Sequence, residues 1–294
     1  MSTTTTPFPA GSIVVGVDGS PSAAEAVTWA AEQALLEHRP LTLVNAYHID
    51  SIFWMESAGV DHHELLQELK EYGETLLDAA KRSALETSPG LEIHEVTYHA
   101  DARTALIEAS TAASMVVLGS RGRGRVTSLL LGSVGVAVVR HSSCPVVVRR
   151  PSRDGVHRGV VVGTDLSDDS RPALEYAYRL ASTRHQPLTV LAFRPDFPWF
   201  GRNAGGDQDW RERERLTALL SDLGEKYPDV RVSEKDVEDP EARALVAAAS
   251  DQDLIVVGSH HEGAVASALG QALAVAVVEH APTTVVVVPN APIG

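Results

Sequence analysis

Short apolar runs rich in valine alternate with longer amphipathic stretches along the whole chain. Runs such as 12–17, 41–46 and 114–118 are bounded by Gly, Pro or Asp and predict buried strands. Between such runs, alanine and larger apolar residues recur at helical spacing. This spacing predicts helices near 20–38, 61–87, 102–112 and 132–142, and near 168–184, 208–226, 240–250 and 266–281.

The two halves of the chain form an internal repeat. Residues 12–20 resemble 159–167, since each apolar run ends in Gly-x-Asp and is followed by a serine suited to cap a helix. Residues 40–46 match 187–193, and 115–120 match 254–259. Each half therefore predicts β-α-β-α-β-α-β-α-β, an α/β fold with a doubly wound parallel sheet of flavodoxin-like or Rossmann-like order.

The repeat also sets the expected domain boundaries. We expect a disordered Thr- and Pro-rich tail over 1–11, a first domain over 12–150, a linker over 151–157 and a second domain over 158–290. The last strand of each half, 146–148 and 285–288, is strongly apolar and should lie at a sheet edge. An unpaired apolar edge promotes association, which pairing of the two edges within the chain would prevent.

Composition narrows the range of partners. The 294 residues carry a net charge of −14, which disfavours nucleic acid and anionic membranes as partners. No secretory signal and no apolar run of about 20 residues is present, so we expect a cytoplasmic protein. The 12 histidines, with adjacent pairs at 62–63 and 260–261, show no metal-ligand spacing. The single cysteine, Cys144, cannot form an internal disulfide and is either a small buried thiol or a redox sensor.

A glycine loop with three arginines follows the fourth predicted strand of the first half. Glycines permit close backbone approach, and successive amides before a helix start form an anion-binding nest. Asp18 ends the first strand, and the carboxyl ends of strands one and four should flank the point where strand order reverses. A carboxylate there suits ribose hydroxyls, while the loop suits phosphates. Alternatively, Asp18 only helps to cap the next helix, and the glycines only end strands.

These motifs together resemble the ATP-binding universal stress proteins. The spacing Gly119-x-x-Gly122-x(9)-Gly132-Ser133, the Gly-x-Asp of strand one and the stretch 140–148 carry the resemblance, which covers nearly the whole chain as a tandem pair of the actinobacterial type. It implies an internal pseudo-dimer of two domains and ATP as ligand, with Mg²⁺ possible beside the phosphates and no dedicated metal cluster. A further homodimer is plausible. The implied nucleotide-binding residues are Gly16, Val17, Asp18, Ala46, Gly119, Ser120, Arg121, Gly122, Arg123, Gly124, Arg125, Gly132, Ser133 and Val134.

The second half departs from this motif. Gly163, Asp165, Gly258 and Gly263 remain as weak candidates. However, His261 stands where the second motif glycine belongs, and Glu262 replaces the arginine at 123. Gln271 stands in the place of Ser133, and the stretch to Gly270 is one residue shorter. The chain therefore predicts one good ATP site, in the first half, and a weak or empty second one.

Three functions remain open. The favoured one is a stress-response regulator in which ATP shifts a conformational or oligomeric equilibrium. The second is an enzyme, either a slow ATPase or a nucleotidyl transferase. No Gly-Lys-[Ser/Thr] phosphate loop and no positioned base supports it, and we assign no catalytic residue. The third is a dimerising scaffold that does not need nucleotide.

Overall fold

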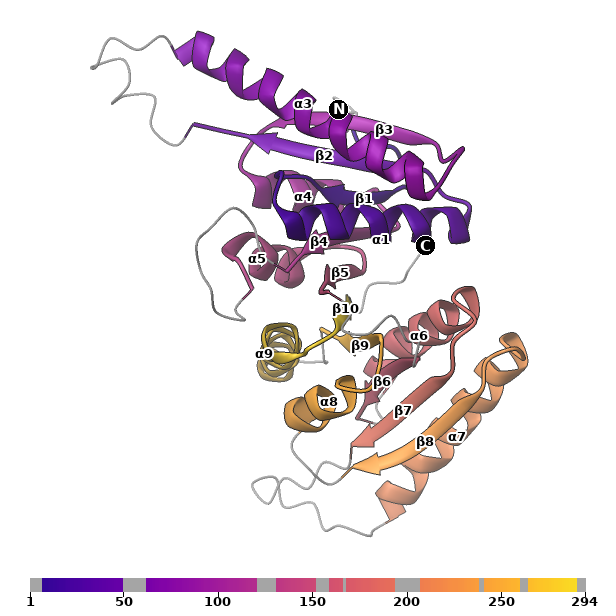
Figure 1. Cartoon of the computed structure of the whole chain (residues 1–294). Helices are drawn as coiled ribbons and strands as arrows, with labels where there is room; N and C mark the ends of the chain where they lie inside the picture. Colours follow the sequence, from indigo (N-terminus) through magenta and orange to yellow (C-terminus); the bar gives the residue numbers. More distant parts are fainter. Residues whose placement is uncertain are drawn as a thin grey trace, which may run out of the picture. The chain divides into compact units, whose positions relative to one another are not determined.

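The computed structural model divides the chain into two compact units, Met1–Arg149 and Arg150–Gly294. It describes residues 7–49, 62–120, 131–151, 159–165, 168–193, 207–237, 241–259 and 264–289. Each unit is built on a parallel sheet of five strands with helices on both faces (Figure 1). The predicted class, two tandem doubly wound α/β units, is confirmed.

The first unit orders its strands β3-β2-β1-β4-β5, with parallel pairing throughout. This is the Rossmann-like order, in which the chain moves outward in both directions from β1. The strands and helices among its described residues are β1 Ile13–Gly16, α1 Pro21–Glu37, β2 Leu41–Tyr47, α3 His62–Thr87, β3 Ile93–His99, α4 Ala102–Ala109, β4 Met115–Gly119, α5 Ser133–His141 and β5 Val146–Arg149.

The second unit repeats this topology as β10-β9-β6-β7-β8, again with parallel pairing. One short 3₁₀ turn, Asp168–Ser170, precedes its first helix. Its other elements are β6 Val160–Thr164, α6 Arg171–Thr183, β7 Leu188–Phe193, α7 Asp207–Lys226, β8 Val232–Val237, α8 Glu241–Ala249, β9 Leu254–Gly258, α9 Ala264–His280 and β10 Thr284–Val288.

Valine-rich central strands form the core of each unit. Side chains on both faces of β1 and β4 are buried, for example Val14, Val15, Val116 and Val117. In the first unit α1 contacts α3, and α4 contacts α5, so the helices form one pair on each face of the sheet (Figure 1). Helices on both faces explain why these strands are apolar at consecutive positions rather than at alternate ones.

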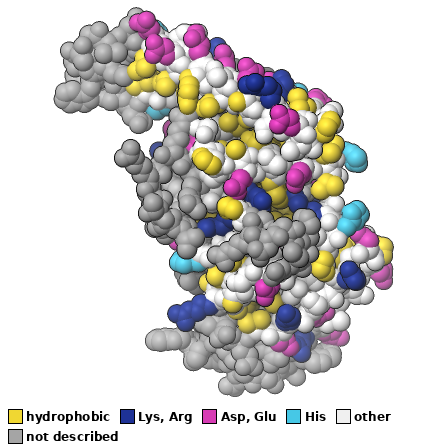
Figure 2. Space-filling view, viewed as in Figure 1, with side chains coloured by type: hydrophobic (Ala, Val, Ile, Leu, Met, Phe, Trp, Pro, Cys, Tyr) yellow, Lys and Arg dark blue, Asp and Glu magenta, His cyan; other side chains and the backbone are white. Residues whose placement is uncertain are grey.

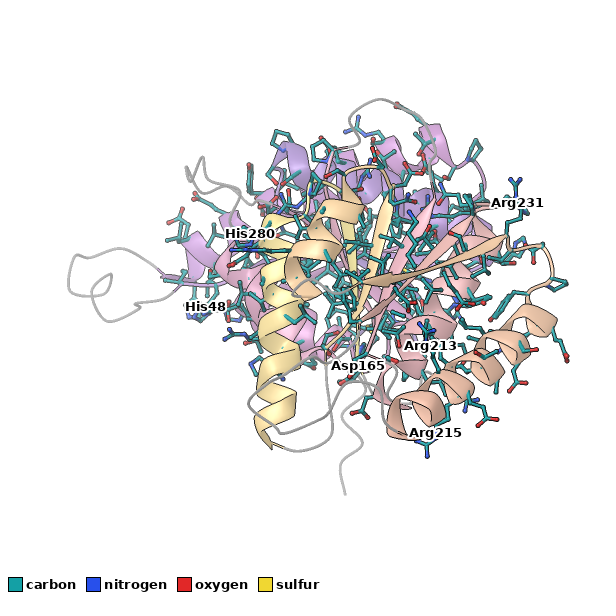
Figure 3. All side chains as sticks on the ribbon, turned by 90° about the horizontal axis from the view of Figure 1, so that it is seen from below. His48, Asp165, Arg213, Arg215, Arg231 and His280 are labelled. Atoms are coloured by element: carbon teal, nitrogen blue, oxygen red, sulfur yellow. The ribbon has the colours of Figure 1, made fainter. Side chains whose placement is uncertain are left out.

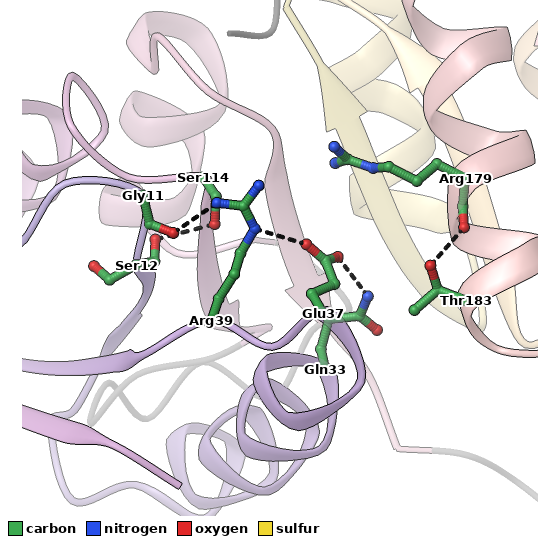
Figure 4. Close-up of polar contacts among 8 residues, drawn as sticks. All are labelled: Gly11, Ser12, Gln33, Glu37, Arg39, Ser114, Arg179 and Thr183. Atoms are coloured by element: carbon green, nitrogen blue, oxygen red, sulfur yellow. Dashed lines mark hydrogen bonds and ion pairs between the residues drawn. The ribbon is translucent and has the colours of Figure 1, made fainter.

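Residues 7–11, which the sequence places in the tail, lie against the first unit. Phe8 is only 3% exposed, and its ring centroid lies 5.3 Å from that of Tyr98. Arg39 donates to the Gly11 carbonyl at 3.0 Å and pairs with Glu37 at 3.3 Å (Figure 4). The aromatic contact and the arginine together hold the segment that leads into β1.

The described surface mixes charges of both signs. Acidic and basic side chains are interspersed on the face drawn in Figure 2. Several form exposed ion pairs, such as Lys81 with Glu95 and Arg213 with Asp236. Among the described residues, no helix is both long enough and apolar enough to span a membrane.

Candidate functional site

The candidate site of the first unit lies where β1 and β4 end side by side. These strands pair in parallel with Val15 opposite Val117, so Asp18 and Gly119 follow at the same edge of the sheet. The structure brings Gly16, Val17, Ala46 and Ser120 to this edge as well. Five predicted residues, Arg121, Gly122, Arg123, Gly124 and Arg125, lie outside the described residues.

Asp18 helps to start α1. Its Oδ1 accepts a hydrogen bond from the Ser20 amide at 2.9 Å, and the Ser20 hydroxyl caps the helix by accepting from the Ala23 amide at 3.2 Å. This is the helix-capping role that the sequence left open. A carboxylate can accept several hydrogen bonds at its two oxygens, so capping at Oδ1 is compatible with ribose binding.

Asn45 fixes the backbone beside Asp18, and the sequence analysis missed it. Its Nδ2 donates to the Val17 carbonyl at 2.7 Å, while the Val17 amide donates to the Val44 carbonyl at 2.8 Å. A Cβ at Gly73 of α3 would lie 2.4 Å from the Asn45 Oδ1, so the helix passes close to this side chain only because residue 73 is glycine. An asparagine inside a largely apolar strand was the available signal.

Gly119 has a packing role that the motif did not reveal. A Cβ there would lie 2.6 Å from both the carbonyl carbon and the carbonyl oxygen of Ser22, in the first turn of α1. The next residue, Ser120, is 4% exposed, and its amide donates to the Arg149 carbonyl at 3.1 Å. That amide is therefore bonded within the sheet, and Gly119 allows β4 to approach α1.

The start of α5 has the properties of an anion site. Gly132 is its N-cap residue, with φ −62° and ψ 158°, and no side-chain hydrogen bond caps the helix among the described residues. Apart from its chain neighbours, no described residue has an atom within 4 Å of the position that a Cβ on Gly132 would take, and Ser133 is exposed. The first amides of a helix have no acceptor within it and carry partial positive charge, so Ser133 and Val134 present donors here.

The second unit is built differently at the corresponding place. The motif spacing aligned Gln271 with Ser133, and the helices of the structure correct this. The chain has equal length from Gly119 to Val138 of α5 and from Gly258 to Val277 of α9, so Gln271 is the counterpart of Gly132 and Ala272 that of Ser133. Because α9 already begins at Ala264, Gln271 lies about two turns inside the helix. Gly263 and the expected serine cap at 167 lie outside the described residues, and α6 has Ser170 as its N-cap.

Cys144 and the histidines are the residues that could supply thiol or metal chemistry. Cys144 is buried, and burial raises the pKa of its thiol to about 11, so almost no thiolate exists at neutral pH. This favours the buried-thiol interpretation over a redox sensor. In the described part of the chain, no group of three or more His, Cys, Asp or Glu side chains is placed to hold a metal ion.

Comparison with known proteins gives a consistent family assignment. The model of the universal stress protein family matches residues 10–150 and 157–289. A universal stress protein of Mycobacterium tuberculosis (strain H37Rv) is 34% identical over 290 residues, covering 94% of this chain and 95% of that protein. One from Mycolicibacterium smegmatis is 32% identical over 291 residues, covering 94% and 96%.

Similarity to solved structures supports the fold. The crystal structure of a universal stress protein from Archaeoglobus fulgidus superposes with a TM-score of 0.71, covering 96% of this chain and 97% of that one. The sequence identity is 18%, so this likeness bears on the fold alone.

Proposed function

The chain belongs to the universal stress protein family, and we propose that it is a regulator that binds one ATP, in its first unit. The ATP would lie across the carboxyl ends of β1 and β4, with the base beside Gly16, Val17 and the backbone of Ala46. Asp18 would accept from the ribose. The single observation that carries the proposal is the start of α5 at Gly132, where no described side chain caps the helix and the first amides can donate to phosphate.

The remaining phosphate contacts would come from the glycine loop. Gly119 and Ser120 lead into it, and Arg121, Gly122, Arg123, Gly124 and Arg125 would surround the phosphates, with Ser133 and Val134 at the far side. Mg²⁺ would be held by the phosphates, because no described group of carboxylates or imidazoles is placed to bind it. The chemistry such a site supplies is binding, and ordering of the loop would shift a conformational or homodimer equilibrium.

Ser133→Asp tests the phosphate position without loss of the helix. A carboxylate at a helix start is favourable by about 0.3–1 kcal/mol, so α5 should be at least as stable as before. The same charge would repel phosphate, and we expect ATP affinity to fall at least tenfold while adenosine affinity changes little. Calorimetric titration measures both.

The internal repeat supplies the matched control. Ala272 is the counterpart of Ser133, since both lie 14 positions after the glycine that ends the fourth strand of their unit. It lies well inside α9, and its side chain is exposed to solvent. Ala272→Asp should leave ATP affinity unchanged, and the wild-type chain should take up one ATP. Two equivalent ATP sites, or equal loss of affinity in the two variants, would contradict the proposal.

A further inference from the structure

Asn45 bonds to the Val17 carbonyl at the point where the pairing of β1 with β2 ends. The last paired residues are Gly16 and Val44, and beyond them the Val17 amide still donates to the Val44 carbonyl at 2.8 Å. The Val17 carbonyl, in contrast, accepts from the Asn45 Nδ2 at 2.7 Å. A side chain of β2 thus holds the acceptor that the main chain of β2 would meet next.

In a regular parallel ladder, the main-chain amide of Ala46 would donate to that carbonyl. Along a strand, successive residues direct their amide and carbonyl groups to alternate neighbouring strands. The Val44 carbonyl accepts from the Val17 amide, so Val44 faces the β1 side. Ala46 lies two residues further along β2 and therefore directs its amide and carbonyl to the same side.

The second unit shows how the ladder ends without such a side chain. Residues 40–46 match 187–193, so Ala192 is the counterpart of Asn45, and its side chain has no donor. In this unit the pairing runs one residue further and includes Thr164 with Ala192. Thr164 is the counterpart of Val17 and the last residue of β6, directly before Asp165 (Figure 3).

The additional pair uses the amide of Phe193, the counterpart of Ala46. At the start of this ladder the Val160 amide donates to the Pro187 carbonyl at 2.9 Å, and the pattern repeats at every second residue. At the Thr164–Ala192 pair, the same pattern gives the Thr164 carbonyl the Phe193 amide as its donor. Asparagine in one unit and alanine in the other therefore accompany two different ends of the same ladder.

We propose that Asn45 is a positioning residue for base recognition, because its side chain replaces the Ala46 amide at the Val17 carbonyl and leaves that amide for the ligand. This inference rests on the proposed function, which places the base beside Val17 and the backbone of Ala46. The amide and the carbonyl of one extended residue form a donor next to an acceptor. Adenine presents a ring-nitrogen acceptor beside an amino donor, whereas guanine has the O6 acceptor in place of the amino group. Asn45 therefore favours adenine over guanine.

Asn45→Ala tests this assignment, since it gives the first unit the residue that the second unit has. The full chain is titrated calorimetrically with ATP, GTP and inorganic triphosphate, and triphosphate reports on the phosphate end of the site alone. We expect the wild-type chain to bind ATP at least tenfold more tightly than GTP. Asn45→Ala should weaken ATP binding at least tenfold, abolish the preference over GTP and leave triphosphate affinity unchanged.

Amide hydrogen exchange at Ala46, followed by NMR on the full chain, gives a second result that loss of folding cannot imitate. Without ligand, the Ala46 amide should exchange more slowly in Asn45→Ala than in the wild-type chain, because it then donates to the Val17 carbonyl as in the second unit. Unfolding would instead speed this exchange.

The inference is overturned if Asn45→Ala lowers ATP and triphosphate affinity equally, or if the Ala46 amide exchanges no more slowly in the variant. It is also overturned if the wild-type chain does not prefer ATP to GTP, or if the variant keeps that preference. Failure of the proposed function would show separately, because the wild-type chain would then give no ATP-binding heat, while exchange at Ala46 would still report how the ladder ends.

Discussion

Substituting alanine for the last residue of β4 should destabilise the first unit, whereas the same change at the end of β9 should not. Gly119 and Gly258 occupy equivalent positions in the repeat, and each ends its strand in a Gly-Ser pair. From the sequence alone, Gly119→Ala and Gly258→Ala are expected to have the same effect on stability. In the structure, the two added methyl groups meet very different surroundings.

The magnitudes follow from the distances to each new Cβ. At Gly119 it would lie 2.6 Å from backbone atoms of Ser22, about 1 Å closer than carbon atoms normally approach. Since the first turn of α1 cannot rotate away as a side chain can, we expect a loss of about 1–3 kcal/mol. At Gly258 the nearest described atom outside its chain neighbours is the Ala173 Cβ at 3.9 Å, an ordinary contact. There, replacing glycine in a strand should be neutral or stabilising by about 0.5–1 kcal/mol.

Amide hydrogen exchange read by mass spectrometry is the suitable assay, because a chain of two units need not unfold in a single transition. Gly119→Ala should speed exchange in peptides from α1, starting at the first turn, where the Ala24 amide bonds to the Ser20 carbonyl at 3.1 Å. Gly258→Ala should leave α6 protected. If the two variants exchange alike in their first helices, or if Gly119→Ala is the more stable, the packing argument is wrong.

Four further substitutions test the structure elsewhere. Gly73→Ala should lower the free energy of unfolding in urea by about 1–3 kcal/mol, because the new Cβ would lie 2.4 Å from the Asn45 Oδ1. Its control is Gly224→Ala in α7, where no described atom lies close to the new Cβ, and which should raise that free energy by up to about 1 kcal/mol. Arg150→Ala should cost roughly 3 kcal/mol, because this buried guanidinium donates to the last carbonyls of α9 at 2.6 and 3.1 Å. Burial raises the pKa of the Cys144 thiol from 9.0 to about 11, so the folded chain binds this proton more tightly than the unfolded chain does. The free energy of unfolding should therefore fall as the pH rises from 9 to 11. Cys144→Ala should remove that part of the pH dependence.

The sequence predicted the elements well because their signals are local. The expected helix at 61–87 is found at His62–Thr87, and the one at 208–226 is found at Asp207–Lys226. Hydrophobic periodicity reports directly which face a helix buries, and it needs no knowledge of the partner. The same pattern, with right-handed crossovers, limited the strand order to a flavodoxin-like or a Rossmann-like one, and the structure has the Rossmann-like order.

Contacts between distant segments were the part that sequence could not supply. Nothing local shows that Gly119 faces Ser22, that Asn45 holds the Val17 carbonyl, or that Phe8 is buried against Tyr98. The motif spacing took Gly270 as the counterpart of the closing glycine, and the structure places it within α9. One glycine costs a helix only about 1 kcal/mol, and the alanine-rich residues around it favour the helix.

In both units an equal length of chain runs from the end of the fourth strand, β4 or β9, to the end of the helix that follows, α5 or α9. The two units divide this length differently between connection and helix. The first has residues 120–132 between β4 and a helix of 9 residues, while the second has residues 259–263 between β9 and a helix of 17 residues. A long connection and a short helix leave the first amides of α5 at the edge of the sheet, where an anion can accept from them. A short connection and a long helix use the corresponding amides for internal hydrogen bonds. If the first unit binds ATP as proposed, helix length after the fourth strand of each unit would select for or against phosphate, and this length can change without altering the sheet.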